Sequence, residues 1–209
     1  MLRGTLQNDK SRIDQVREAT EAAALQINEA RKLGLRWGED AIQSMLGGFG
    51  LTEGCAALRS WLPKGTVSEK LLYRASVNGW AAAGFHRLCD GENNALVIAI
   101  DTEGSIFGGF TAHGFDSSNS YISDAQAFLF TLKNPSNSAP EKFGLVSAGY
   151  ETQAVFCHAT YGPTFGAGHD LLISGTGTIT SNWRSYSNPR RIVLTNSGQL
   201  KDCFVFALK

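Results

Sequence analysis

The 209-residue sequence has little proline, no excess of charge of either sign and no long hydrophobic run. Its 19 basic residues balance its 19 acidic ones. A nucleic-acid-binding protein normally carries a basic patch and a high isoelectric point, so this balance argues against nucleic acid as a partner. No wholly apolar run exceeds six residues, whereas a membrane-spanning helix needs about 20. We therefore expect no membrane insertion, and the start of the chain shows no apolar leader.

Cysteine is also scarce, and its spacing matches no zinc or redox motif. The four cysteines are Cys55, Cys89, Cys157 and Cys203. The sequence contains no Asn-x-Ser/Thr acceptor for glycosylation. These features favour four reduced thiols that pack as small apolar side chains in a reducing compartment. We expect a cytoplasmic protein that needs no cofactor.

Glycine and hydrophobic residues are what the sequence has in quantity. Hydrophobic residues make up 43% and charged residues 18% of the chain, which excludes a disordered polymer. A chain of this length buries roughly 70% of its surface on folding and needs no metal or disulfide staple. The 23 glycines with five prolines indicate a β-rich chain with many turns.

The first part of the chain differs from the rest. Residues 11–33 contain neither glycine nor proline and predict an amphipathic helix that ends at Gly34. Its apolar seam, with a 3-4-3-4-3 spacing, consists of Ile13, Val16, Thr20, Ala23, Ile27 and Ala30. The seam is just under three heptads long. It is compatible with a helix lying on the domain, with a short coiled coil that makes a homo-oligomer, or with a frayed terminus. We assign residues 1–47 to this helix and a glycine-rich linker, and residues 48–209 to a separate domain.

The remaining chain reads as short strands between glycine-rich turns, with helices near its start. Helices are predicted at 52–63 and 81–88. Strands are predicted at 71–75, 95–100, 106–110, 127–132, 155–157, 171–173, 192–194 and 204–206. The turn at 101–104 makes 95–110 a hairpin. This pattern predicts an α+β fold, a two-sheet antiparallel β-sandwich with a few short helices.

His86 and Cys89 are the candidate pair for thiol or metal chemistry, because an i, i+3 spacing places both on one helix face. Zinc needs three or four ligands, and at most one residue of the neighbouring pair Cys157 and His158 can join them. A reactive thiolate needs a helix N-terminus or a cation, whereas Cys89 lies near a helix C-terminus beside Arg87. The alternative is structural, with His86 tethering the helix and Cys89 packing inward. We assign no catalytic residue and no metal ligand.

A second candidate is the glycine-rich segment with Gly162, Gly166 and Gly168, followed by His169 and Asp170. It lacks the Lys-Ser/Thr ending of a phosphate-binding loop, so it predicts a tight turn. His169 and Asp170 do not form part of a Ser-His-Asp triad, because adjacent side chains entering a strand diverge. No Gly-x-Ser-x-Gly motif is present either.

Several motifs occur in an order that resembles the TLDc domain, known from the oxidation-resistance proteins. They are LLYRAS (71–76), GW (79–80), FHRLCDG (85–91), FGGF (107–110), AFLF (127–130) and YGPTFGAGHDL (161–171). The last motif is similar to the versions found in protists and invertebrates. The resemblance covers about residues 48–209.

The resemblance implies two packed antiparallel sheets, protection from oxidative damage and, for some members, regulation of the proton-pumping V-ATPase. It implies no catalytic residue. His86, Cys89, Gly162, Gly166 and Gly168 match positions of the family's sequence signature, and the resemblance gives them no further role. We expect a non-catalytic interaction module whose partner is a V-ATPase subunit. The alternatives are a small thiol- or metal-dependent antioxidant enzyme that uses Cys89 with His86, and a structural protein that self-assembles through its N-terminal helix.

Overall fold

The computed structural model describes residues 41–65, 69–134, 139–182, 184–187 and 197–209. These residues belong to one compact unit, Trp37–Lys209. The predicted helix at 11–33, with its coiled-coil seam, and the predicted strand at 192–194 lie outside the described residues. Within the described ranges, no helix is both long and apolar enough to cross a membrane.

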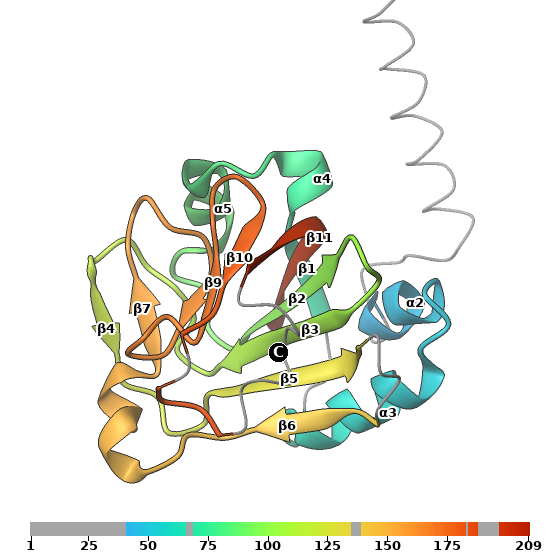
Figure 1. Ribbon diagram of the computed structural model, residues 1–209, viewed down its shortest axis with the longest axis horizontal. Helices are drawn as coiled ribbons and strands as arrows, with labels where there is room; N and C mark the ends of the chain where they lie inside the picture. The colour runs from blue at the N-terminus through green and yellow to red at the C-terminus, as the bar shows by residue number, and fades with distance from the viewer. Residues whose placement is uncertain (1–40, 66–68, 135–138, 183, 188–196) are drawn as a thin grey trace, which may run out of the picture. The chain divides into compact units, whose positions relative to one another are not determined.

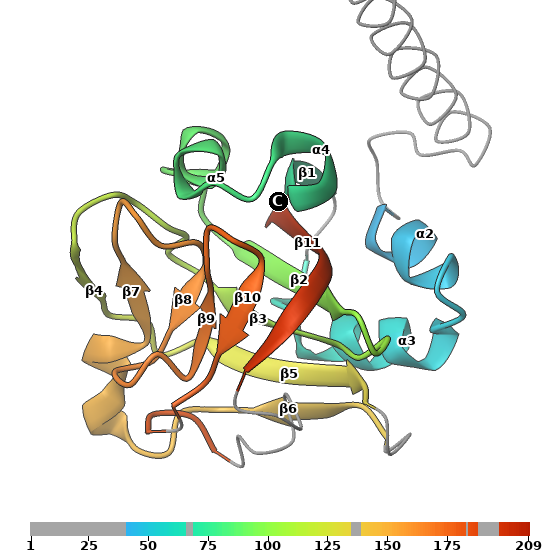
Figure 2. The ribbon, with the colours of Figure 1, turned by 45° about the horizontal axis from the view of Figure 1, so that its top comes forward.

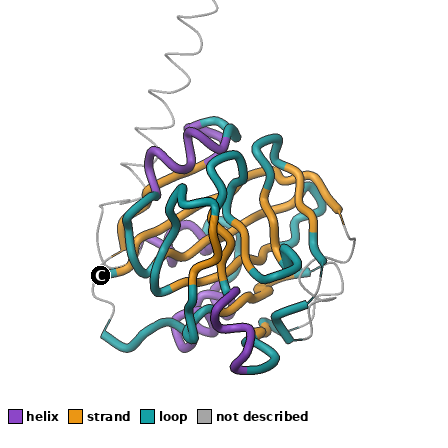
Figure 3. Tube along the Cα trace, turned by 90° about the vertical axis from the view of Figure 1, so that its left-hand side faces the viewer, coloured by secondary structure: helices purple, strands orange, loops and turns teal. Residues whose placement is uncertain are grey.

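Short helices surround two layers of strands (Figures 1 and 3). The helices are α2 (Ala41–Gly47), α3 (Thr52–Trp61), α4 (Ala75–Asn78), α5 (Ala82–Cys89) and the 3-10 helix η1 (Ala148–Gln153). The strands are β1 (Glu69–Arg74), β2 (Ala95–Asp101), β3 (Ile106–Thr111), β4 (Ser120–Ile122), β5 (Phe128–Lys133), β6 (Glu141–Phe143), β7 (Val155–Cys157), β8 (Thr164–Phe165), β9 (Leu171–Ile173), β10 (Thr178–Thr180) and β11 (Ser197–Leu208). Each pairing between these strands is antiparallel, which confirms the predicted α+β sandwich.

The strands form two sheets that share β11. The first sheet has the order β1-β11-β2-β3-β5-β6, and the second has the order β4-β7-β8-β9-β10-β11. The beginning of β11 pairs with β10, whereas its remainder pairs with β2 and β1. A register shift between Leu200 and Asp202 marks the change. Such a bulge bends a strand, so one strand passes from the second sheet to the first.

The central strands of the first sheet, β2 and β3, are buried on both faces. Val97 and Ala99 of β2 face the second sheet, in a core that also contains Phe165. Leu96 and Ile98 face the opposite way, toward α2 and α3 (Figure 2). This is why the run from 95 to 100 is apolar without alternation, since a strand covered on both faces needs apolar side chains on each.

Helix α2 packs on one face of the first sheet through Ile42 and Leu46, which are both fully buried. From the sequence alone, the glycine-rich segment at 45–50 reads as a linker. The Ile42 N–H donates to the Glu69 carboxylate, at 2.6 Å, and so joins α2 to β1. Helix α3 begins at Thr52 and ends before Pro63, close to the prediction, although Leu51 occupies the N-cap position and no side chain caps the helix.

Candidate functional site

Five half-buried rings lie in contact around the second sheet. They are Tyr121 of β4, Phe156 of β7 and, from the following loops, His158, Tyr161 and His169. We call them the aromatic–histidine cluster. Ring centroids are separated by 4.8 Å for Tyr121–Phe156, 5.2 Å for Phe156–His169 and 4.7 Å for His158–Tyr161. Phe156 and His169 are stacked, and the other two pairs are tilted. Ring pairs at such separations attract each other, which favours this arrangement.

The strand alternation of β7 explains why the cluster faces away from the core. Val155 and Cys157 are buried between the sheets, so Phe156 points to the other face. Phe156 lies opposite Tyr121 in the β4–β7 register. The Tyr121 hydroxyl donates to the Ala167 carbonyl oxygen at 3.0 Å, which ties β4 to the glycine-rich loop.

His86 of α5 holds the loop of residues 158–161 through hydrogen bonds. His86 Nε2 lies 3.0 Å from the carbonyl oxygens of both His158 and Tyr161. The Tyr161 N–H donates to the His158 oxygen at 2.9 Å, and the Ala159 N–H donates to Asn119 Oδ1 at 3.1 Å. These bonds fix the backbone from which two rings of the cluster project.

His169 makes the cluster less polar than its composition suggests. Burial lowers the pKa of its imidazole below the ordinary value, an effect that Asp170 partly offsets and His158 reinforces. The ring is therefore mainly neutral at pH 7. His169 also has a positive φ of 57°, a conformation that histidine adopts more readily than most residues.

Asp170 points into the protein while His169 points into the cluster. The Asp170 carboxylate is fully buried and accepts the backbone N–H groups of Arg184, Ser185 and Tyr186 at 2.9, 2.6 and 2.8 Å. Burial raises its pKa, an effect that these donors oppose. The side chain thus clamps one segment of chain onto another.

The glycines of the loop make room for this clamp. Gly166 has a φ of +85°, and a Cβ there would lie 2.6 Å from Asp170 Cγ. Gly162 and Gly168 lie against the backbone oxygens of Ile173 and Asn182. This loop is the tight turn that its glycines indicate, and it places Asp170 and His169 on opposite sides.

The comparison with known families identifies the domain that these motifs build. A family model for the TLDc domain matches residues 52–208. The chain belongs to the TLDc domain family. A search of the curated proteins finds no match to it.

In this TLDc domain, His86 and Cys89 share a face of α5 and are both buried, at 8% and 1% exposure. Burial raises the pKa of the Cys89 thiol well above its ordinary value, and the charges of Asp90 and Glu92 raise it further. Both effects disfavour the thiolate that thiol chemistry requires. Among the residues with a described position, no group of three or more His, Cys, Asp or Glu side chains is placed to hold a metal ion.

Cys89 packs among apolar side chains of the TLDc domain, in the core between the two sheets. The other cysteines are equally inaccessible, with at most 3% exposure. We predict that an aromatic disulfide reagent labels none of the four thiols in the native protein and all four in denaturant. Absorbance of the released thiol measures this. Rapid labelling of native protein that is absent in Cys89→Ser would instead support the antioxidant-enzyme alternative.

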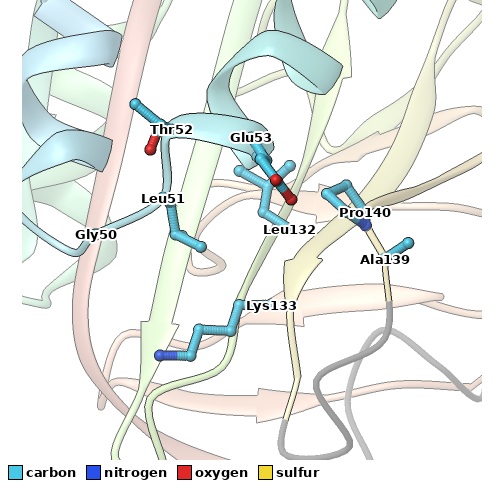
Figure 4. Close-up of a pocket in the computed structure, with 9 residues that line it drawn as sticks. Gly50, Leu51, Thr52, Glu53, Leu132, Lys133, Ala139 and Pro140 are labelled. Carbon is cyan, nitrogen blue, oxygen red and sulfur yellow. The ribbon is translucent and has the colours of Figure 1, made fainter.

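The TLDc domain also has a pocket of about 370 Å³ beside the start of α3. Gly50, Leu51 and Leu132 are among its lining residues, and Glu53 and Lys133 supply the ionisable side chains (Figure 4). Figure 4 shows Lys133 extending away from Glu53, so the two charges do not converge on one point. Neither this pocket nor the aromatic–histidine cluster follows from the sequence pattern alone. The one usable signal for the cluster was the outward position of Phe156 between two buried residues.

Proposed function

We propose that this TLDc domain is a non-catalytic protein-interaction module and that the aromatic–histidine cluster is its contact surface. The observation that carries the proposal is the contact between five half-exposed rings on a backbone already held by hydrogen bonds. Large aromatic side chains dominate the binding energy of protein interfaces. A rigid surface loses little conformational entropy when a partner docks.

The partner that we propose is a subunit of the V-ATPase, with a protective role against oxidative stress in the cytoplasm. Membership of the TLDc family supports this partner, because some members of the family regulate that pump. The reduced, buried state of the cysteines is compatible with a reducing compartment.

Truncation of a central ring tests the surface. Tyr161→Ala removes a ring that contacts Phe156, His158 and His169. We expect it to weaken capture of the V-ATPase subunit roughly 30-fold, which corresponds to about 2 kcal/mol for a hot-spot residue. The measurement is a pull-down from native lysate followed by titration with the purified subunit.

Tyr150→Ala is the matched control, since Tyr150 is a half-buried tyrosine of η1 outside the cluster. It should bind like the parent protein. Equal binding by both variants would contradict the proposed surface. Recovery of no V-ATPase subunit above an unrelated bait would contradict the proposed partner.

A further inference from the structure

We propose that His86 and Asp90 form a proton-dependent clamp, which holds the 158–161 loop and its rings in the docking position only while the His86 ring carries both protons. The proposal rests on the proposed function for the role of the rings. The clamp itself is a property of the isolated chain and can be measured without a partner.

Oxygen atoms face both nitrogens of the His86 ring. Nδ1 lies 2.7 Å from Asp90 Oδ1, and Nε2 lies 3.0 Å from the carbonyl oxygens of His158 and Tyr161. The two carbonyl oxygens can only accept hydrogen bonds, and the same holds for Asp90 Oδ1 while its carboxylate is ionised. A neutral imidazole has one N–H and one lone pair, whereas the imidazolium has two N–H groups. Only the protonated ring therefore donates on both sides.

Either neutral tautomer leaves a ring lone pair facing an oxygen lone pair. If Nδ1 keeps the proton, Nε2 faces two carbonyl oxygens without a donor. If Nε2 keeps it, Nδ1 faces the Asp90 carboxylate. The ring is only 8% exposed, so water has little access to replace the missing bond. Deprotonation therefore weakens the attachment of α5 to the 158–161 loop.

Other titratable groups act near the same loop. Asp116 is close enough to interact electrostatically with His86, and Ser117 donates its hydroxyl proton to Asp90 Oδ2 at 2.7 Å. His158 Nδ1 lies 2.9 Å from the Thr160 hydroxyl oxygen and accepts the Thr160 backbone N–H at 3.3 Å. A proton on Nδ1 would remove the acceptor of this N–H, whereas the hydroxyl, which both donates and accepts, could keep its contact.

Asp90→Asn separates the clamp from these other effects. The new amide oxygen can accept from Ser117, as Oδ2 does now, while its nitrogen donates to Nδ1 of a neutral His86. Nε2–H then donates to the two loop carbonyls. The variant should hold the loop with a neutral ring, while the titration of His158 remains in both proteins and cancels in their comparison.

The experiment is NMR of the full chain from about pH 5 to about pH 8, the range in which histidines titrate. Ring nitrogen shifts report the protons of His86, and amide exchange corrected for its intrinsic pH dependence reports Ala159 and Tyr161. As His86 loses a proton, we expect protection of these amides to fall at least about tenfold in the parent protein. The fall should be absent in Asp90→Asn. His113→Gln, which removes an exposed histidine, should behave like the parent protein.

Three outcomes would overturn the clamp: loop protection that does not follow the His86 titration, an equal fall in Asp90→Asn, or a His86 ring that keeps both protons throughout the range. Capture of the V-ATPase subunit over the same range gives the second readout. Capture should weaken with rising pH in the parent protein and stay level in Asp90→Asn. If the loop responds as expected and capture does not follow, the clamp stands and the proposed contact surface fails.

Discussion

Gly108→Ala is expected to destabilise the protein by more than about 3 kcal/mol, or to prevent folding, because no space exists for one methyl group. Gly108 lies in β3, between β2 and β5. A Cβ there would overlap the backbone oxygen of Val97 and approach Phe130 Cζ to 2.9 Å. A side chain can rotate away from such a contact, but the backbone of β2 is held by its pairing with β11 and β3. Urea unfolding followed by circular dichroism measures the loss.

Gly144→Ala provides the control for Gly108→Ala. A Cβ at Gly144 would meet no heavy atom within 4 Å, so we expect a change within about 0.5 kcal/mol. Parental stability of Gly108→Ala would mean that β2 and β3 do not approach as closely as described. The adjacent Gly109 leaves room for packing on the other face of β3, where a Cβ would lie 2.8 Å from the Phe165 ring. The FGGF motif thus allows close packing on both faces of one strand.

Asp170→Ala is expected to cost at least about 3 kcal/mol, since three backbone N–H groups lose a shared acceptor at about 1 kcal/mol or more each. Ser185 and Tyr186 are fully buried, so water cannot readily replace the carboxylate. The Tyr186 hydroxyl also donates to the Ala154 carbonyl at 2.8 Å, and this bond should weaken when the segment is released. Thermal and urea unfolding measure the effect.

Asp170→Asn should be less harmful than Asp170→Ala, because its amide oxygen keeps part of the acceptor capacity. Glu103→Ala removes an exposed carboxylate and should stay within about 0.5 kcal/mol of the parent protein. An Asp170→Ala protein as stable as Glu103→Ala would show that the hydrogen bonds to the Asp170 carboxylate contribute nothing to stability. We also expect amide shifts at His169 in Asp170→Ala, since the two residues share one backbone turn.

The sequence was sufficient for elements whose pattern is local. The β2–β3 hairpin follows from two apolar runs around the turn at 101–104, and the structure confirms it. Helix α5 lies within one residue of the predicted bounds. The ordered motifs were sufficient for the TLDc family, which the family model confirms over residues 52–208.

Other elements had no local pattern to reveal them. Strands β4, β8 and β10 contain two or three residues each, and each includes a serine or threonine. They lack the wholly apolar run that made the equally short β7 and β9 predictable. Helix α2 ends in a glycine-rich segment and reads as a linker. Its place in the folded unit depends on the burial of Ile42 and Leu46 against the first sheet. The residues next to them in the sequence do not predict this contact.

By itself, then, the sequence determined the fold class, the family and the buried state expected of the thiols, because these depend on composition, local periodicity and ordered motifs. Only the tertiary structure decided which side chains meet. Tyr121 lies 35 positions before Phe156, whose ring it contacts, and His86 lies 72 positions before the His158 carbonyl that it contacts. Such contacts arise from strand pairing and sheet packing, which bring distant segments together through the energy of the whole core and not through any local signal.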